Sequence, residues 1–219
     1  MLDVIYEDNH LLVVNKPINV PMMEDESGDL DLLNMCKAYI KEKYHKPGDV
    51  YLGLVHRLDR PVSGLCVFAR TSKAASRLSD SIRKGEFIKE YEAVVSDNGL
   101  KDEGVFIDKL KKDHHKNMSF VASDGKDSKL SYQLIARKDN LALVRIHLYT
   151  GRSHQIRVQF KSRNHPLFGD QRYNPKAKVG QQIALHSCYL AFPHPTKKEM
   201  MTFEKHAERY PFDIWREYE

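Results

Sequence analysis

The sequence predicts an α+β domain, because strand patterns and amphipathic helix patterns occur along one chain with no long linker between them. The 219 residues suit one sizeable domain or two small ones, and the 41% hydrophobic content is adequate for a packed core. The chain contains no internal repeat and no low-complexity tract. We therefore expect residues 1–219 to form one compact domain.

The first half of the chain is expected to contain a β-hairpin followed by two helices. Apolar stretches at residues 4–6 and 11–15 flank a turn-forming tetrapeptide, which predicts two strands. Apolar side chains recur at helical spacing from residue 30 to about residue 43, and again over residues 72–84. Residues 45–49 (HKPGD) contain proline and glycine and should break the chain after the first helix.

The second half is expected to be richer in strands. Residues 88–95 are predicted to form a strand that carries Tyr91, and residues 130–137 and 141–148 are predicted to form a hairpin. Residues 97–129 contain turn-forming residues and a basic segment, so we expect turns there.

The sequence favours a soluble, cytoplasmic protein. No apolar run approaches the roughly 18 residues of a membrane span, and the start of the chain lacks the charged and apolar regions of a signal peptide. The three cysteines, Cys36, Cys66 and Cys188, match neither a disulfide framework nor a zinc-binding pattern. We expect all three to be reduced packing residues.

The net charge of +5 is a mild excess, so the distribution of the charges is more informative than their sum. The clearest basic run is residues 109–116 (KLKKDHHK). Runs of this kind are more often solvated faces than binding sites. The adjacent histidines His114 and His115 lack helical spacing, which argues against zinc binding there.

A carboxylate between two guanidinium groups is the most informative feature of the chain. It belongs to Asp59, which Arg57 and Arg60 flank within residues 56–65 (HRLDRPVSGL). Nearby cations favour the ionised form of a carboxylate, and an ionised, oriented carboxylate acts as a nucleophile or a base. Taken alone, such an aspartate is more often part of a structural ion pair.

A second polar cluster lies in residues 150–158 (TGRSHQIRV). Gly151 permits a tight turn, and Ser153 is a suitable N-terminal cap for a helix. The apolar side chains of residues 156–160, however, alternate with the period of a strand. The residues alone leave both structures open, and a basic cluster of this kind is more often a solvated face than a site.

Together, these motifs resemble those of the RluA family of RNA pseudouridine synthases, and the resemblance runs almost from end to end. Residues 56–64 resemble the family's signature around its catalytic aspartate, and residues 150–157 resemble its third motif. The motifs occur in the family's order and spacing. The other matching segments are the opening strands in residues 5–17, residues 89–95 around Tyr91, residues 165–173 and residues 185–195.

The resemblance implies both a fold and a reaction. The fold would be a mixed, largely antiparallel central sheet with flanking helices and loops. The reaction would convert specific uridines in structured ribosomal or transfer RNA to pseudouridine, by detaching uracil from ribose C1′, turning it and rejoining it through C5. The family needs no cofactor, and the sequence has no phosphate-binding loop, dinucleotide fingerprint or metal-ligand spacing. We expect a monomer whose partner is RNA rather than a membrane.

Three residues match the family's catalytic positions. Asp59 is expected to attack ribose C1′ or base C6, or to promote glycal formation, and the sequence leaves these routes open. Arg157 is expected to pair with Asp59 and to keep it ionised and aimed. Tyr91 offers a ring that stacks on uracil and a hydroxyl that assists removal of the C5 proton.

Five further residues are expected to bind the substrate. A uridine inside a folded stem must be flipped out, and the planar guanidinium of Arg57 is suited to brace the gap. Phosphate contacts are expected from Arg60, Arg152 and the basic segment 109–116, while His56 mainly orients its loop. The residues assigned to substrate binding are His56, Arg57, Arg60, Arg152 and His154.

Two positions depart from the family's pattern. Val62 stands where the family usually has threonine, and Asn19 stands where glycine is common. Val62 removes one hydroxyl near the site, whereas asparagine tolerates a positive φ better than most residues. Neither position is catalytic, so we expect the fold and the activity to persist and only the substrate preference to change.

Two other functions compete with this interpretation. A catalytically silent RNA-binding protein of the same fold would have lost a catalytic residue, yet Asp59, Tyr91 and Arg157 are all present. A glycosidase acting on sugars usually needs a second carboxylate, and no paired acidic motif stands out in this sequence.

Overall fold

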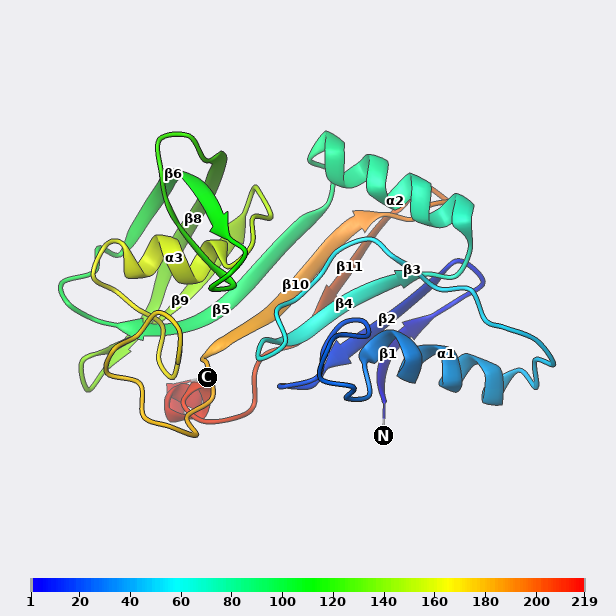
Figure 1. Cartoon of the computed structure of the whole chain (residues 1–219), viewed down its shortest axis with the longest axis horizontal. Helices are drawn as coiled ribbons and strands as arrows, with labels where there is room; N and C mark the ends of the chain where they lie inside the picture. Colours follow the sequence, from blue (N-terminus) through cyan, green and yellow to red (C-terminus); the bar gives the residue numbers. More distant parts are fainter. Residues whose placement is uncertain (1, 219) are drawn as a thin grey trace. The chain divides into compact units, whose positions relative to one another are not determined.

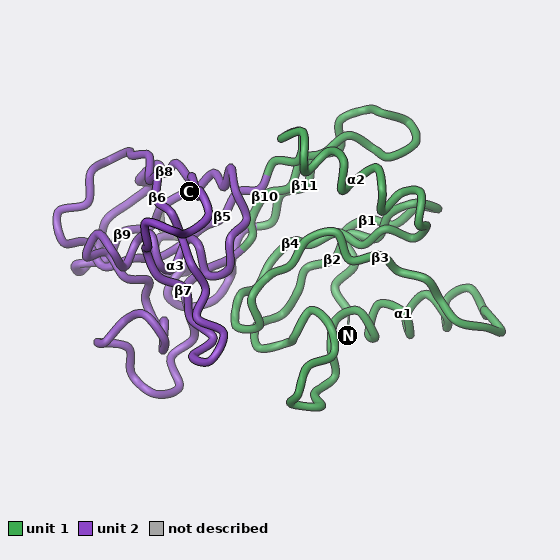
Figure 2. Tube along the Cα trace, turned by 45° about the horizontal axis from the view of Figure 1, so that its top comes forward, with its two compact units in different colours: residues 1–88, 187–205 green, residues 89–186, 206–219 purple. Residues whose placement is uncertain are grey.

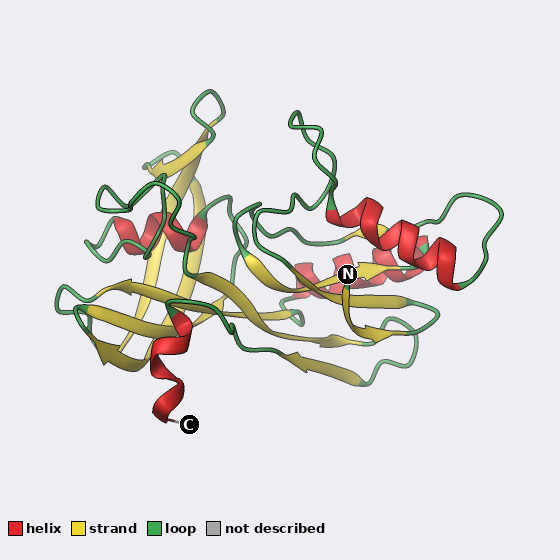
Figure 3. Ribbon diagram, turned by 90° about the horizontal axis from the view of Figure 1, so that it is seen from below, coloured by secondary structure: helices red, strands yellow, loops and turns green. Residues whose placement is uncertain are grey.

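The computed structural model describes residues 2–218 and contains two compact units, which Figure 2 colours separately. Unit 1 comprises residues 1–88 and 187–205, and unit 2 comprises residues 89–186 and 206–219. Both units are rich in strands, and Figure 3 distinguishes these from the helices. The expectation that the two units act as one domain stays a prediction.

Unit 1 contains strands in the order β1-β2-β4-β10, with β3 paired to β4 and β11 paired to β10 (Figure 1). The ladders β1–β2, β2–β4, β3–β4 and β10–β11 are all antiparallel. The first two residues of β10 belong to unit 2. The elements are β1 (Asp3–Glu7), β2 (Leu11–Lys16), α1 (Leu32–Lys43), β3 (Gly53–Leu54), β4 (Ser63–Ala69), α2 (Ser72–Lys84), β10 (Leu185–Pro193) and β11 (Met200–Glu204).

The capping residues set the bounds of both helices in unit 1. The α2 helix has the predicted bounds: Thr71 accepts a hydrogen bond from a backbone N–H of the first turn at 3.1 Å, and Gly85 ends the helix at a φ of 75°. The α1 helix begins at Leu32 rather than near residue 30, because Asp31 caps it. Leu30 therefore lies outside the helix and is exposed.

The central strands of unit 1 are buried on both faces. On one face, Leu11, Leu65 and Val67 pack in a core with residues of α2 and β10. The alternate residues along β2 and β4, such as Leu12 and Cys66, are equally buried. Strands covered on both faces are continuous apolar runs rather than alternating patterns, which explains why β2 was recognisable in the sequence.

Unit 2 contains strands in the order β5-β9-β8-β6-β7, and the ladders between these neighbours are antiparallel. The predicted hairpin is confirmed, because β8 and β9 meet at a tight turn in which Asp139 and Asn140 both have positive φ. The elements are β5 (Ile88–Ser96), β6 (Glu103–Asp113), β7 (Met118–Val121), β8 (Lys126–Lys138), β9 (Leu141–Leu148), α3 (Gln155–Lys161) and the 3₁₀ helix η1 (Phe212–Tyr218).

The expectation of turns over residues 97–129 was largely wrong. Strands β6 and β7 and the start of β8 occupy most of this segment. Phe106 and Leu110 are buried on β6, but the residues around them are mostly charged or exposed. An antiparallel strand with one solvated face has few apolar positions, so its sequence resembles a polar loop.

The cluster at residues 150–158 leads into a helix and not a strand. The helix α3 begins after His154, whose φ of 54° is left-handed, and Ser153 does not cap it. Six of the seven residues of α3 are buried, including Arg157 and Gln159. Because this short helix is buried nearly all round, its apolar residues do not mark one face, and the alternation in the sequence was misleading.

The α+β class and the largely antiparallel sheet are confirmed. Cys36, Cys66 and Cys188 are buried and form no disulfide within residues 2–218, as expected of reduced packing residues, and burial raises the pKa of Cys36 to about 12. Within residues 2–218, no helix combines the length and the apolar character needed to cross a membrane.

Gly64 is required at the start of β4 for two reasons. Its φ of +119° is rarely adopted by a residue with a side chain, and a Cβ atom there would lie 2.3 Å from the carbonyl oxygen of Ser187. We expect Gly64→Ala to lower the free energy of unfolding by about 2–4 kcal/mol, as measured by urea denaturation.

The control for Gly64→Ala is Gly85→Ala. Gly85 also has a positive φ, but a Cβ atom there would meet no atom within 4 Å. Gly85→Ala should lower the free energy of unfolding by only about 1 kcal/mol, because it adds the strain of a left-handed backbone but no clash. Equal losses in the two variants would contradict the proposed clash with Ser187.

Asp8 joins the β1–β2 turn to the turn between β10 and β11. Its carboxylate accepts hydrogen bonds from the backbone N–H groups of His10 (2.7 Å) and Leu11 (2.8 Å) and from His194 Nε2 (2.8 Å). Burial alone would raise the pKa of Asp8, but these hydrogen bonds outweigh burial and lower it to about 2. The ionised carboxylate therefore stabilises unit 1.

Acid should remove this stabilisation. The folded pKa of Asp8 lies below its unfolded value of 3.8, so the unfolded chain binds more protons as the pH falls from about 5 to 1. At pH 7, we expect the free energy of unfolding of Asp8→Asn to be about 2 kcal/mol lower than that of the wild type. This difference should shrink towards zero near pH 2. Urea denaturation across this pH range measures the difference in the free energy of unfolding, and Asp49→Asn, at an exposed aspartate, is the control. A difference independent of pH would contradict the stabilising role of the ionised Asp8 carboxylate.

Candidate functional site

Asp59 lies in unit 1, on the loop that leads into strand β4. Its backbone carbonyl accepts a hydrogen bond from the N–H of Val62 at 2.9 Å, which closes a turn. Leu58, on the other side of Asp59, is buried, as is the side chain of Val62. The loop is therefore anchored before and after Asp59, whose own position is half-buried.

A buried lysine for which no role was predicted also holds this loop. Lys16 is fully buried at the end of β2, and its Nζ donates hydrogen bonds of 2.9 Å to the carbonyl oxygens of Pro17 and Arg60. Burial lowers the pKa of Lys16 to about 8, although attraction to Asp59 favours the charged form. Lys16 therefore fixes the backbone beside Asp59 and places a positive charge near its carboxylate. A lysine two residues after the apolar run 11–14 was the available signal.

His56 fixes the start of the same loop. Its Nε2 accepts a hydrogen bond from the backbone N–H of Val67 on β4 at 3.0 Å, and its ring centroid lies 5.5 Å from that of Phe87. These contacts tie His56 to β4, and its assignment to substrate binding stays a prediction. The neighbouring side chain of Arg57 is exposed, so a partner in solution can reach it.

Arg60 contacts an acidic loop rather than open solvent alone. Its guanidinium forms ion pairs with Asp29 and, at 3.4 Å, with Asp25, and it donates a hydrogen bond to Ser27 Oγ at 2.9 Å. The phosphate contact expected of Arg60 stays a prediction. A phosphate at this position would compete with the two carboxylates.

The two departures from the family's pattern have simple structural consequences. Asn19 has a φ of 62°, so it adopts the left-handed conformation that asparagine tolerates. Val62 is only 2% exposed. An apolar side chain suits that buried position, where a hydroxyl would need a hydrogen-bond partner.

Tyr91 lies in unit 2 on strand β5, opposite Ile146 of β9, and is only 6% exposed. Its sequence neighbours point to the other face of the strand. There, Glu90 accepts a hydrogen bond from Arg145 Nε at 2.7 Å. Lys89, on the same side of β5 as Tyr91, is half-buried, and burial lowers its pKa. Tyr91 is thus buried on a strand that is paired with β9.

Arg157 forms a bidentate ion pair that the sequence analysis did not foresee. Its Nε and one terminal nitrogen donate to the two oxygens of Asp170 at 2.8 and 2.7 Å, and both side chains are buried. The guanidinium carbon also lies 5.1 Å from the ring centroid of Tyr173. Within unit 2, Asp170 is therefore an ion-pair partner of Arg157. The expected pairing of Arg157 with Asp59 stays a prediction.

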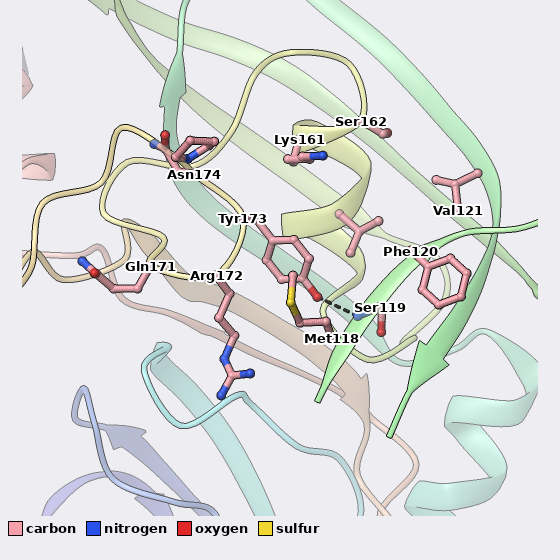
Figure 4. A pocket seen from close by; sticks show the side chains of 12 residues that line it. Met118, Ser119, Phe120, Val121, Lys161, Ser162, Gln171, Arg172, Tyr173 and Asn174 are labelled. Atoms are coloured by element: carbon pink, nitrogen blue, oxygen red, sulfur yellow. Dashed lines mark hydrogen bonds between the residues drawn. The ribbon is translucent and has the colours of Figure 1, made fainter. Parts of the chain in front are cut away.

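Tyr173 connects three parts of unit 2 around this ion pair. Its hydroxyl accepts a hydrogen bond from the backbone N–H of Ser119 on β7 at 2.7 Å and lies 2.7 Å from Nδ1 of His154 (Figure 4 shows the bond to Ser119). His154 is thus held by Tyr173 directly before α3. Asp170 and Tyr173 both belong to the matching segment 165–173, but the sequence analysis assigned them no role.

Arg152 and the basic segment lie on the surface of unit 2. Arg152 is exposed, and its Nε donates to the carbonyl oxygen of Asp127 at 2.9 Å. Residues 109–116 form the end of β6 and the start of the turn to β7. Lys111 in this segment forms an ion pair with Asp124. The roles of Arg152 and of this segment in RNA binding stay predictions.

Each unit thus contains some of the predicted site residues. Unit 1 holds Asp59 on a loop fixed by Lys16 and His56. Unit 2 holds Arg157 against Asp170. Unit 1 also contains Arg57 and Arg60, and unit 2 also contains Tyr91, Arg152, His154 and Tyr173.

Comparison with known sequences identifies the family. A family model described as RNA pseudouridylate synthase matches residues 10–162. The chain is 32% identical over 207 residues to the uncharacterized RNA pseudouridine synthase YhcT of Bacillus subtilis, covering 93% of this chain and 68% of that protein. It is 35% identical over 226 residues to ribosomal large subunit pseudouridine synthase D of Yersinia pestis, covering 94% of this chain and 66% of that protein.

Solved structures show the same fold. Human RNA pseudouridylate synthase domain containing 4 superposes with a TM-score of 0.79 at 21% identity, covering 95% of this chain and 89% of that chain. Human RNA pseudouridylate synthase domain containing 1 superposes with a TM-score of 0.74 at 23% identity, covering 94% of this chain and 84% of that chain. The family match includes the segments that carry Asp59, Tyr91 and Arg157. The chain therefore belongs to the RNA pseudouridylate synthase family and is an isomerase, an RNA pseudouridine synthase.

Proposed function

We propose that Asp59 is the nucleophile of this synthase and that the substrate is a uridine in structured ribosomal RNA. The observation that carries the first part is the anchored loop of Asp59, which Lys16 and His56 fix through the backbone. The second part is supported by relatives named ribosomal large subunit pseudouridine synthase D, at 30–35% identity. Transfer RNA is the alternative substrate.

The proposed reaction rearranges one nucleotide without adding or removing atoms. The bond between uracil N1 and ribose C1′ breaks, the base turns, and a new bond forms between C5 and C1′. C5 then loses its proton and N1 gains one, so the product is an isomer of the substrate. Asp59 supplies the carboxylate that assists the departure of the base, whether by attack at C1′ or C6 or by forming a glycal.

Lys16 would support Asp59 through the backbone. A carboxylate nucleophile must be ionised and aimed, and a loop fixed on both sides restricts the directions in which it can point. Because Lys16 binds the carbonyl oxygen of Arg60, movement of the loop would strip a buried ammonium of a hydrogen bond. That loss is costly in a buried position, so the geometry of the loop is strongly specified.

Arg157 and Tyr91 are proposed to complete the site. The bidentate contact with Asp170 fixes the plane of the Arg157 guanidinium, so its orientation would be set before substrate arrives. The ring of Tyr91 is proposed to stack on the uracil, and its hydroxyl to assist loss of the C5 proton. His154 and Arg152 are proposed to contact the RNA beside the target nucleotide.

The remaining proposals concern the setting of the reaction. We propose that the two units form one catalytic domain that acts as a monomer in the cytoplasm, where ribosomal RNA is available. A catalytically silent RNA-binding protein is not favoured, because the relatives are named as synthases and the three catalytic candidates are retained in this sequence.

Replacing Asp59 tests the central proposal. We expect Asp59→Asn to fold and to bind RNA but to isomerise at less than about a hundredth of the wild-type rate, because an amide cannot act as the nucleophile; this ratio corresponds to about 2.7 kcal/mol. Single-turnover pseudouridine formation on transcribed ribosomal RNA measures the rate. The matched control is Asp49→Asn, at an exposed aspartate of unit 1, which should keep the wild-type rate. Turnover by Asp59→Asn above that limit would refute the assignment.

Replacing Arg57 separates base flipping from chemistry. We expect Arg57→Ala to lose more activity on a target held in a stem-loop than on the same uridine in a short flexible strand, where little extrusion energy is needed. Single-turnover rates of the wild type and Arg57→Ala are compared on the stem-loop and on the flexible strand. The control is Arg83→Ala, at an exposed arginine of α2. Equal losses on the two RNAs would reject the flipping role and leave Arg57 as an electrostatic neighbour of Asp59.

A further inference from the structure

Unit 2 contains a cavity of about 460 Å³ between strand β7, helix α3 and the loop that follows Asp170 (Figure 4). Its volume lies within the range of ligand pockets in proteins. Met118, Phe120 and Val121 of β7 form one wall, and Val158 of α3 forms another. None of the proposed catalytic residues lines it.

The β7 wall of the cavity leaves large apolar side chains in solvent. Phe120 is 46% exposed and Val121 is 47% exposed. Strand β7 is the last strand in the order of unit 2. An exposed aromatic ring beside a cavity offers a flat surface on which a planar group can stack.

The rim of the cavity is cationic. Lys161 of α3 is exposed, and Arg172 is held at the opposite side because its guanidinium donates to the carbonyl oxygens of Lys116 and Asn117 at 3.3 and 3.1 Å. None of the twelve lining residues, all of which the structure describes, is acidic. An apolar wall with a positive rim suits a ligand that combines a planar base with a negative phosphate.

The inner wall of the cavity is shared with the group around Arg157. Tyr173 lines the cavity, and its ring lies 5.1 Å from the guanidinium carbon of Arg157. A ligand in the cavity would therefore touch a side chain that also supports Arg157 and His154. This links the cavity to the residues proposed to act on the substrate.

We propose that this cavity is a second nucleobase site, which takes an unpaired base of the RNA other than the target uridine. The base stacks on Phe120, and the flanking phosphates contact Lys161 and Arg172. This inference rests on the proposed RNA substrate and extends it, because it assigns single-stranded RNA next to the target as the segment that the enzyme reads by stacking. Recognition by stacking tolerates different bases, since every base has a π-face.

The test uses a fluorescent twelve-nucleotide oligoadenylate, which contains no uridine and so cannot present a target. Its affinity is measured by fluorescence anisotropy at fixed salt, because salt alone changes the affinity of RNA. We expect Phe120→Ala to bind it about tenfold more weakly than the wild type. Ile107→Ala removes an apolar side chain that is 67% exposed on β6 and outside the cavity, and it should change the affinity less than twofold.

An abasic oligonucleotide of the same length separates stacking from charge. Phe120→Ala should bind this probe as the wild type does, whereas Lys161→Gln should weaken the binding of both probes. The control Lys101→Gln, at an exposed lysine of unit 2 outside the cavity, should weaken neither. Phe120→Leu keeps the apolar bulk but lacks the ring, so it should still bind oligoadenylate several-fold more weakly. Equal effects of Phe120→Ala and Ile107→Ala, or equal losses by Phe120→Ala on both probes, would overturn the proposal.

The result can be separated from the test of Asp59. If Asp59→Asn retains isomerase activity, the catalytic assignment fails while the Phe120 comparison still decides the nucleobase site. If Phe120→Ala and Lys161→Gln leave oligoadenylate binding unchanged, the nucleobase site fails while the catalytic assignment stands.

Discussion

The candidate site of unit 1 depends on one buried cation. The ammonium of Lys16 is removed from water and is compensated by two backbone carbonyl groups, one of which belongs to the residue after Asp59. Removing a charged group from water is costly unless it is hydrogen-bonded, so the loop must close over Lys16 for the unit to be stable. The same requirement fixes the backbone of Asp59. Stability and the position of the proposed nucleophile therefore share one interaction.

A second buried charge organises unit 2 in a comparable way. Arg157 and Asp170 form a bidentate pair inside the unit, and breaking such a pair leaves an uncompensated buried charge. Tyr173 packs against the guanidinium and joins it to β7 and to His154. In both units, a buried charged side chain is held by a group from another element, 44 residues away for Lys16 and 13 residues away for Arg157. Such preorganisation lets a site act on substrate without rearranging first, and it explains why polar residues are buried in a short helix such as α3.

Within unit 2, the residues around Arg157 and the cavity proposed to bind a base share one loop. Arg157 faces a carboxylate on a loop, and the same loop contributes Arg172 and Tyr173 to the wall of a cavity. RNA that places a base in this cavity would contact the loop that holds Arg157. A synthase that reads unpaired bases by stacking would distinguish target regions by shape and single-stranded character, which is how proteins commonly recognise RNA.

The sequence by itself determined strand β2, the bounds of helix α2, the β8–β9 hairpin and the motif around Asp59, because apolar patterns and turn residues are local signals. It did not reveal β6 and β7, whose solvated faces resemble a polar loop, and the alternation in α3 suggested a strand, because that helix is buried nearly all round. Only the tertiary structure decided that Lys16 binds the carbonyl of Arg60 and that Arg157 pairs with Asp170. The physical reason is that a buried charge takes its partner from whatever group the fold brings near, and the Lys16 contact spans 44 residues.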